Sequence, residues 1–168
     1  DLTQALNYLH QNQEKLEIST ENIVLMGHSA GAFNVMSAVY HPKPNTIQCL
    51  GNIKAIFGLA GPYHFDYKGD PLAEDAFDQS ISYKEVMPYY FVNQNHIKHY
   101  LLMAENDQLV KKENTFDLDQ ALRQSGNHSH IAVIPKTGHI TILASLSSFV
   151  SHYFRTKRTI LHFLDEVF

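Results

Sequence analysis

Apolar positions along this chain gather in short uniform runs, separated by longer stretches with helical spacing. The uniform runs are too short and too apolar to have a face in water, which is typical of strands in a parallel sheet with both faces covered. The expected strands occupy 22–26, 53–59, 100–104 and 130–134. The expected helices occupy the N-terminal residues, about 30–40, about 114–125 and the C-terminal residues. We expect Asn114 to cap the third helix and Gly126 to follow its end. This alternation predicts an α/β fold with a doubly wound, mostly parallel sheet.

Two stretches interrupt the alternation. The segment 41–45 contains two prolines and stops the second helix. Residues 63–95 mix aromatic residues, acids and prolines with short helical pieces, and this is long for a connection inside a compact domain. The aromatic residues fit two interpretations equally: the wall of an acyl or aryl pocket, or packing against the body of the domain. We therefore expect one domain over 1–168 with a cap-like excursion at about 63–95.

The segment Gly27–Gly31 has the form Gly-x-Ser-x-Gly and joins an expected strand to an expected helix. In this context the pentapeptide is typical of a nucleophile elbow, a sharp turn that holds a serine in a strained conformation. The residues two positions on either side must lack bulk, and both are glycine. The alternative is an ordinary Gly/Ser turn. We interpret Ser29 as a nucleophile.

A serine nucleophile needs an imidazole to take its proton and a carboxylate to orient that imidazole. In a parallel sheet, such side chains come from the loops that follow the strands. Asp107 follows the third expected strand and His139 follows the fourth, in the chain order Ser, Asp, His. Asp66 and Glu105 are the rival acids. We predict a triad of Ser29, Asp107 and His139.

Other polar residues near the expected site are candidates for binding substrate. His28 precedes the nucleophile, and we expect it to be structural or to line the pocket, because adjacent residues in such a turn point apart. Tyr63 and His64 follow the second expected strand. We predict a substrate-binding position for these three residues.

The chain contains 11 histidines, so a metal site has to be considered. Two pairs have suitable spacing, one on a strand face and one on a helical face (His128 with His130, His96 with His99). Neither pair has a convincing third ligand, and we expect no metal.

Composition excludes several classes of protein. The chain has 168 residues, of which 44% are hydrophobic and 18% charged, which is sufficient for one globular domain. Its net charge is −4, and its basic residues are scattered apart from a small cluster at 155–158, so we expect no nucleic-acid partner. No apolar run reaches membrane-spanning length, and no signal-peptide pattern is present. We expect a cytoplasmic protein.

Three local segments together resemble the α/β-hydrolase superfamily: Gly-His-Ser-Ala-Gly-Ala at 27–32, Glu-Asn-Asp-Gln-Leu-Val at 105–110, and Gly-His at 138–139. Within it the chain resembles the carboxylesterase and lipase-like branch, which also holds arylformamidase-like and feruloyl-esterase-like enzymes. The resemblance implies a serine hydrolase that cleaves a carboxylic ester, thioester or amide through an acyl-enzyme and needs no cofactor. Two alternatives share the fold: a non-catalytic binding protein, and an acyltransferase that passes the acyl group to an alcohol.

The resemblance covers only the second half of a hydrolase domain. It implies an oxyanion hole made by the backbone N–H of Ala30 and by a second N–H from a glycine-rich loop, which would lie before Asp1. Without further strands the segment 22–26 would be a sheet edge with unpaired backbone groups. We therefore expect the missing N-terminal half of the same domain to be a partner of this chain, alongside a small-molecule ester.

Overall fold

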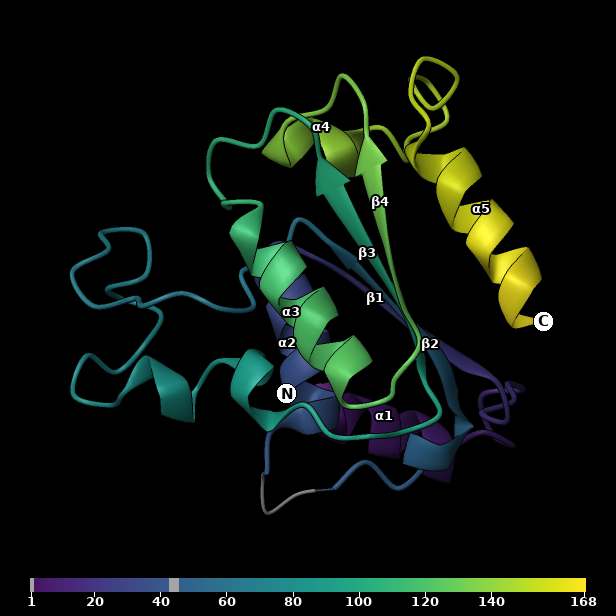
Figure 1. The fold of residues 1–168 in the computed structure, drawn as a ribbon. Coiled ribbons are helices and arrows are strands. Elements are labelled where there is room, and N and C mark those ends of the chain that lie inside the picture. Colours follow the sequence, from purple (N-terminus) through teal and green to yellow (C-terminus); the bar gives the residue numbers. More distant parts are fainter. Residues whose placement is uncertain (1, 43–45) are drawn as a thin grey trace.

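The protein is built around a parallel sheet of four strands (Figure 1). The structure is a computed structural model and describes residues 2–42 and 46–168. The strands are β1 (Ile23–His28), β2 (Ile53–Leu59), β3 (Lys98–Ala104) and β4 (Ser129–Ile134). They lie in the order β1-β2-β3-β4, and every neighbouring pair is parallel. The predicted strands and the predicted α/β class are confirmed.

Helices cover both faces of the sheet. They are α1 (Leu2–Gln11), α2 (Ala30–Tyr40), α3 (Glu113–Gln124), α4 (His139–Ala144) and α5 (Thr156–Val167). One apolar cluster joins α1, α2 and α3 to strand residues such as Ile56 and Leu101. A second cluster joins α4 and α5 to the alternate strand residues, among them Phe57 and Leu102. Because both faces are covered, every residue of β2 except Lys54 is buried, which explains its uniformly apolar sequence.

The helix ends differ from expectation at one position. The predicted N-cap role of Asn114 is wrong, since Lys112 holds the cap position of α3 and Asn114 lies inside the helix. The Asn114 side-chain oxygen instead accepts the backbone N–H of His64 at 2.8 Å. Gly126 follows the helix end with φ 80°, in the left-handed region expected of such a glycine. The predicted break at 41–45 lies partly outside the described residues, and α2 ends at Tyr40.

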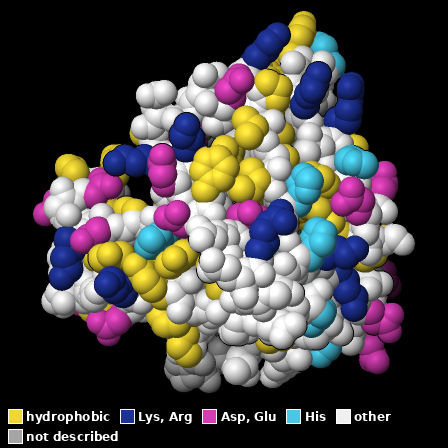
Figure 2. All heavy atoms as spheres, viewed as in Figure 1, with side chains coloured by type: hydrophobic (Ala, Val, Ile, Leu, Met, Phe, Trp, Pro, Cys, Tyr) yellow, Lys and Arg dark blue, Asp and Glu magenta, His cyan; other side chains and the backbone are white. Residues whose placement is uncertain are grey.

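The excursion at 63–95 contains only two short 3₁₀ helices, Tyr83–Glu85 and Pro88–Phe91; a third, Leu50–Asn52, precedes β2. The excursion forms the lobe at the left of Figure 1. Figure 2 shows hydrophobic, acidic and basic side chains together on the visible surface of this lobe. A separate apolar cluster centred on Tyr67 and Met87 holds it together, with Phe33 of α2 packed against that cluster. The excursion is thus fastened to the helix that follows Ser29.

Among the described residues, β1 pairs with β2 alone and forms one edge of the sheet. Met26 on this strand is 52% exposed. Within the same residues we find no helix whose length and apolar character would let it cross a bilayer.

Candidate active site

Ser29 lies in the sharp turn between β1 and α2. Its backbone has φ 55° and ψ −125°, a conformation that costs a non-glycine residue about 1–3 kcal/mol. The turn is held by the Ser29 backbone N–H, which donates to the Leu59 carbonyl at 2.9 Å. A Cβ on Gly27 would lie 2.2 Å from the Gly31 carbonyl oxygen, whereas a Cβ on Gly31 would meet no atom within 4 Å. The expected need for a small residue is confirmed at Gly27, where the backbone of Gly31 occupies the space of a side chain, and it is wrong at Gly31, where that space is open.

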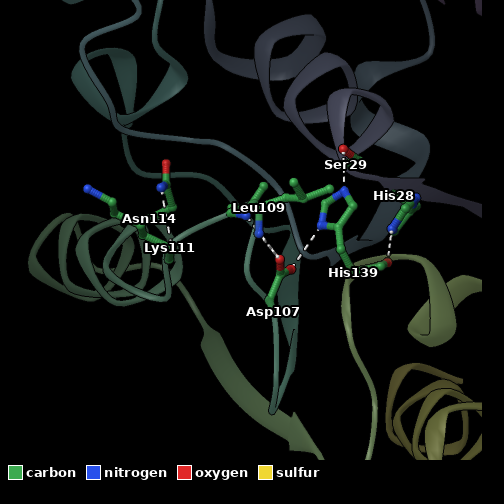
Figure 3. Close-up of polar contacts among 8 residues, drawn as sticks. His28, Ser29, Asp107, Leu109, Lys111, Asn114 and His139 are labelled. Carbon is green, nitrogen blue, oxygen red and sulfur yellow. Dashed lines mark hydrogen bonds and ion pairs between the residues drawn. The ribbon is translucent and has the colours of Figure 1, made fainter. Parts of the chain in front are cut away.

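The side chains of Ser29, His139 and Asp107 form one hydrogen-bonded chain (Figure 3). The His139 Nε2 lies 2.8 Å from the Ser29 Oγ, and its Nδ1 lies 2.9 Å from the Asp107 Oδ2. Each residue follows the end of a different strand: β1, β3 and β4. The sheet brings together three residues that are far apart in sequence.

The Asp107 carboxylate is held on its other side by the backbone. Its Oδ1 accepts the N–H groups of Leu109 at 2.9 Å and Val110 at 3.0 Å. The side chains of Asp107 and His139 are only 8% and 10% exposed. These hydrogen bonds stabilise the charge of a carboxylate that has little contact with water.

The partners determine where the imidazole proton sits. An ionised carboxylate only accepts hydrogen bonds, so the His139 Nδ1 carries the proton. Its Nε2 then has a free lone pair and accepts the hydroxyl hydrogen of Ser29. This is the arrangement in which an imidazole can remove a proton from a serine.

Ser29 and His139 open onto a cavity of about 620 Å³. Phe33 of α2 contributes to its wall, and so do Phe65 and Phe77 of the excursion. The rings of Phe33 and Phe77 meet edge to face with centres 5.5 Å apart. Aromatic residues of the excursion thus serve both interpretations made from the sequence: Phe65 and Phe77 line the cavity, while Tyr67 lies in the lobe's own core.

The three residues predicted to bind substrate do not line this cavity. Tyr63 is fully buried in the core, where its ring packs against Gly58 and Gly61. His64 points to α3, with its Nδ1 2.6 Å from Asp117 Oδ2. His28 lies beside His139, with its Nε2 2.7 Å from the His139 carbonyl oxygen. The structure gives these residues places in the core and behind the site.

The rival acids do not contact His139. Asp66 lines the cavity, and its Oδ1 accepts the backbone N–H of Lys68. Glu105 accepts the backbone N–H of Lys136 at 2.8 Å. Within the part of the chain that the structure describes, no three His, Cys, Asp or Glu side chains come together as metal ligands.

Several contacts in the structure have no signal in the sequence. They are the N–H groups that hold Asp107 and, away from the cavity, the contact between His64 and Asp117. Backbone donors carry no residue-type signal, and Asp117 belongs to no local motif. His139, which we expected in the loop after the fourth strand, is the first residue of α4.

A doubly wound parallel sheet with this serine, histidine and aspartate at the strand ends is the α/β-hydrolase fold. The model of the prolyl oligopeptidase family matches residues 1–168. The chain therefore belongs to the prolyl oligopeptidase family, within the α/β-hydrolase superfamily. A search of curated proteins found no match.

Solved structures of esterases have the same fold. Esterase 2 of Thermogutta terrifontis, phosphoramylated by tabun, is 17% identical with a TM-score of 0.74, over 98% of this chain and 62% of that one. The propionate-bound form of that esterase is 18% identical with a TM-score of 0.66, over 84% of this chain and 55% of that one. An acetyl ester-xyloside bifunctional hydrolase from Caldicellulosiruptor lactoaceticus is 15% identical with a TM-score of 0.75, over 98% and 64%. The chain spans less than two thirds of the length of these proteins.

Proposed function

We propose that this serine hydrolase cleaves carboxylic esters through an acyl-enzyme formed on Ser29. The observation that carries the proposal is the hydrogen-bonded chain Ser29–His139–Asp107 with its serine open to a cavity. A strained serine within 2.8 Å of an imidazole lone pair has a base in place before substrate arrives. The fold alone would leave the chemistry open.

In the proposed reaction His139 takes the proton of Ser29 while the Ser29 Oγ attacks the ester carbonyl. Asp107 holds the imidazole in the required tautomer and stabilises its cationic form. His139 then gives the proton to the leaving alcohol, and the acyl group stays on Ser29. A water molecule, deprotonated by His139, releases the acid and restores the serine.

The tetrahedral intermediate carries a negative charge on the former carbonyl oxygen, which needs hydrogen-bond donors. Ala30 begins α2 and lines the cavity, and the first backbone N–H groups of a helix have no acceptor within that helix. We propose the Ala30 N–H as one donor. We further propose that additional strands of the same domain pair with the exposed edge of β1 and bring a second donor.

The cavity supports a small or medium apolar substrate. Its volume of about 620 Å³ lies in the range of small-molecule sites, and the rings of Phe33, Phe65 and Phe77 contribute to its wall. Propionate-bound and butyrate-bound forms are known for the Thermogutta terrifontis esterase. We propose short acyl esters as substrates of this chain as well.

The test measures hydrolysis of p-nitrophenyl acetate, butyrate and octanoate by the purified protein and by Ser29→Ala. We expect kcat/KM to fall by a factor of at least about 10⁴ in the variant. Ser37→Ala is the matched control, because Ser37 is buried in α2, the helix that follows Ser29, and its hydroxyl has no hydrogen-bond partner in the described residues. Turnover that survives in Ser29→Ala would overturn the proposal.

A further inference from the structure

His28, the last residue of β1, contacts the backbone of His139. Its Nε2 lies 2.7 Å from the His139 carbonyl oxygen, as Figure 3 shows, and the two ring centres are 4.8 Å apart with planes tilted by 45°. A carbonyl oxygen only accepts a hydrogen bond, so the His28 Nε2 carries a hydrogen and donates it. His28 is therefore a donor aimed at the residue that bears the base.

The surroundings favour the neutral form of this imidazole. Burial lowers the pKa of His28 below its usual range, and the neighbouring His139 lowers it further, while the bond to the His139 carbonyl acts in the opposite sense. A neutral ring with its hydrogen on Nε2 has no hydrogen on Nδ1. His28 can therefore hold its position without adding a positive charge beside His139.

His139 needs such a hold because the helix that it begins is weakly anchored. Among the residues of α4 only Ile142 is buried, whereas Ile140 and Leu143 are 72% and 46% exposed. The His139 side chain is bound at Nδ1 by Asp107 and at Nε2 by Ser29, and the Ser29 contact is lost when the serine becomes acylated. The His28 bond holds the backbone of His139 and does not depend on the state of the serine.

We propose that His28 is a positioning residue that keeps the His139 imidazole at reacting distance from Ser29 throughout the cycle. This inference rests on the proposed function of the same site. His28 and Ser29 are neighbours in one rigid turn, so the same elbow places the nucleophile and clamps the backbone of the base. His28 transfers no proton and does not line the cavity.

Two variants separate the donor from the ring. His28→Phe keeps an aromatic ring beside His139 and removes the donor, whereas His28→Gln restores an N–H group near the position of Nε2. His41→Phe is the matched control, because the His41 Nε2 likewise bonds a backbone carbonyl, that of Glu85, and its ring packs on Phe91. The control removes the same kind of bond away from Ser29.

The measurement is kcat and KM for p-nitrophenyl butyrate, with kcat expressed per serine titrated by a fluorophosphonate. For His28→Phe we expect kcat to fall by about 10- to 100-fold with KM changed by less than about threefold, since small displacements of a reacting group cost up to about 100-fold. For His28→Gln we expect kcat within about threefold of the parent, and for His41→Phe an unchanged value. Expressing kcat per titrated serine removes any effect of lost folded protein, and His28→Leu replaces His28→Phe if the latter does not fold.

Nitrogen NMR of the imidazoles gives a second readout. In the parent and in His28→Gln we expect the His139 Nδ1 proton to be protected from exchange, and in His28→Phe to exchange faster. An unchanged kcat in His28→Phe, a loss confined to KM, or a His28→Gln variant as slow as His28→Phe would each overturn the role of His28. A parent protein whose serine is not labelled at all would instead overturn the proposed function.

Discussion

Two histidines in this protein have the same set of partners, and only one of them lies at the cavity. His139 has Asp107 on Nδ1 and the Ser29 hydroxyl on Nε2. His64 has a carboxylate on Nδ1, that of Asp117 at 2.6 Å, and a hydroxyl on Nε2, that of Tyr90 at 2.9 Å. Each histidine thus links a carboxylate to a hydroxyl, and we call this arrangement a row. Such a row does not define a site by itself.

The surroundings of the two rows differ. The pair His139 and Asp107 is almost buried, whereas Asp117 has a side chain that is 40% exposed. The Tyr90 hydroxyl also has a pKa raised to about 12, first by burial and then by the neighbouring Tyr83. The row at His64 instead connects the excursion to α3, and its ring stacks on Tyr89 with centres 3.9 Å apart. The strained turn and the cavity thus distinguish the row that we propose to be catalytic, whereas the row at His64 packs the excursion against α3.

The largest expected effect separates the two carboxylates. In Asp107→Asn the amide oxygen stays with the N–H groups of Leu109 and Val110, and the NH2 group faces the His139 Nδ1. The imidazole then loses the required tautomer, and we expect kcat to fall by about 10³- to 10⁴-fold. In Asp117→Asn we expect kcat within about threefold of the parent. Steady-state hydrolysis of p-nitrophenyl butyrate measures both. Equal losses in the two variants would contradict the distinction.

The second prediction tests the strained turn that only the first row possesses. The Cβ of Gly27→Ala would lie 2.2 Å from a backbone oxygen, so we expect unfolding to become easier by more than about 3 kcal/mol or activity to be lost. Gly31→Ala has free space for its Cβ, and we expect a change below about 1 kcal/mol. Urea unfolding followed by circular dichroism compares the two. A tolerated Gly27→Ala would mean that the turn is not as tight as described.

A third histidine, His99, differs from both because its ring nitrogens bond a carbonyl and a hydroxyl instead of a carboxylate and a hydroxyl. The His99 Nδ1 donates to the His128 carbonyl, and its Nε2 accepts the Tyr40 hydroxyl at 2.7 Å. Burial lowers its pKa from 6.5 to about 4. Between pH 6.5 and 4 the unfolded chain therefore binds a proton that the folded protein does not. The contribution of His99 to the free energy of unfolding is fully present above pH 6.5 and is lost as the pH falls to 4.

We expect this loss to reach about 3 kcal/mol. Urea unfolding at several pH values measures it, and His99→Gln should remove most of the slope between pH 6.5 and 4. An unchanged slope in that variant would show that another group titrates.

The smallest expected effect concerns the hydroxyl of the second row. Tyr90→Phe removes the bond to His64 and leaves the ring packing in place, so we expect a loss of about 1 kcal/mol in stability. We expect no change in kcat. Thermal unfolding and ester hydrolysis on the same samples measure the two quantities, and a large drop in kcat would place His64 in the reaction after all.

Local sequence patterns predicted the framework and the principal row well. The strand 53–59 is uniformly apolar because both its faces are covered, and the pentapeptide at Ser29 requires a strand before it and a helix after it. From these anchors the strand-end rule led to Asp107 and His139. The strained turn at Ser29, the parallel sheet and the row at His139 could therefore be predicted from short-range sequence patterns.

The other contacts depend on long-range packing, which a single sequence does not display. Tyr63 follows a strand in the same way as a site residue. Its ring is nevertheless buried in the core, where it fills the space that side chains at Gly58 and Gly61 would occupy. Asn114 has the residue type of a helix cap, but its side-chain oxygen instead accepts a hydrogen bond from the backbone N–H of His64. In both cases the deciding partner comes from another segment of the fold.

The most direct test of the central claim is intact-mass and peptide mapping of the purified protein after exposure to a fluorophosphonate. The reagent reacts with a serine whose hydroxyl is activated by a neighbouring base. We predict one adduct, located on Ser29, and its disappearance in His139→Ala. An unlabelled protein, or an adduct on another residue with Ser29 free, would contradict the account.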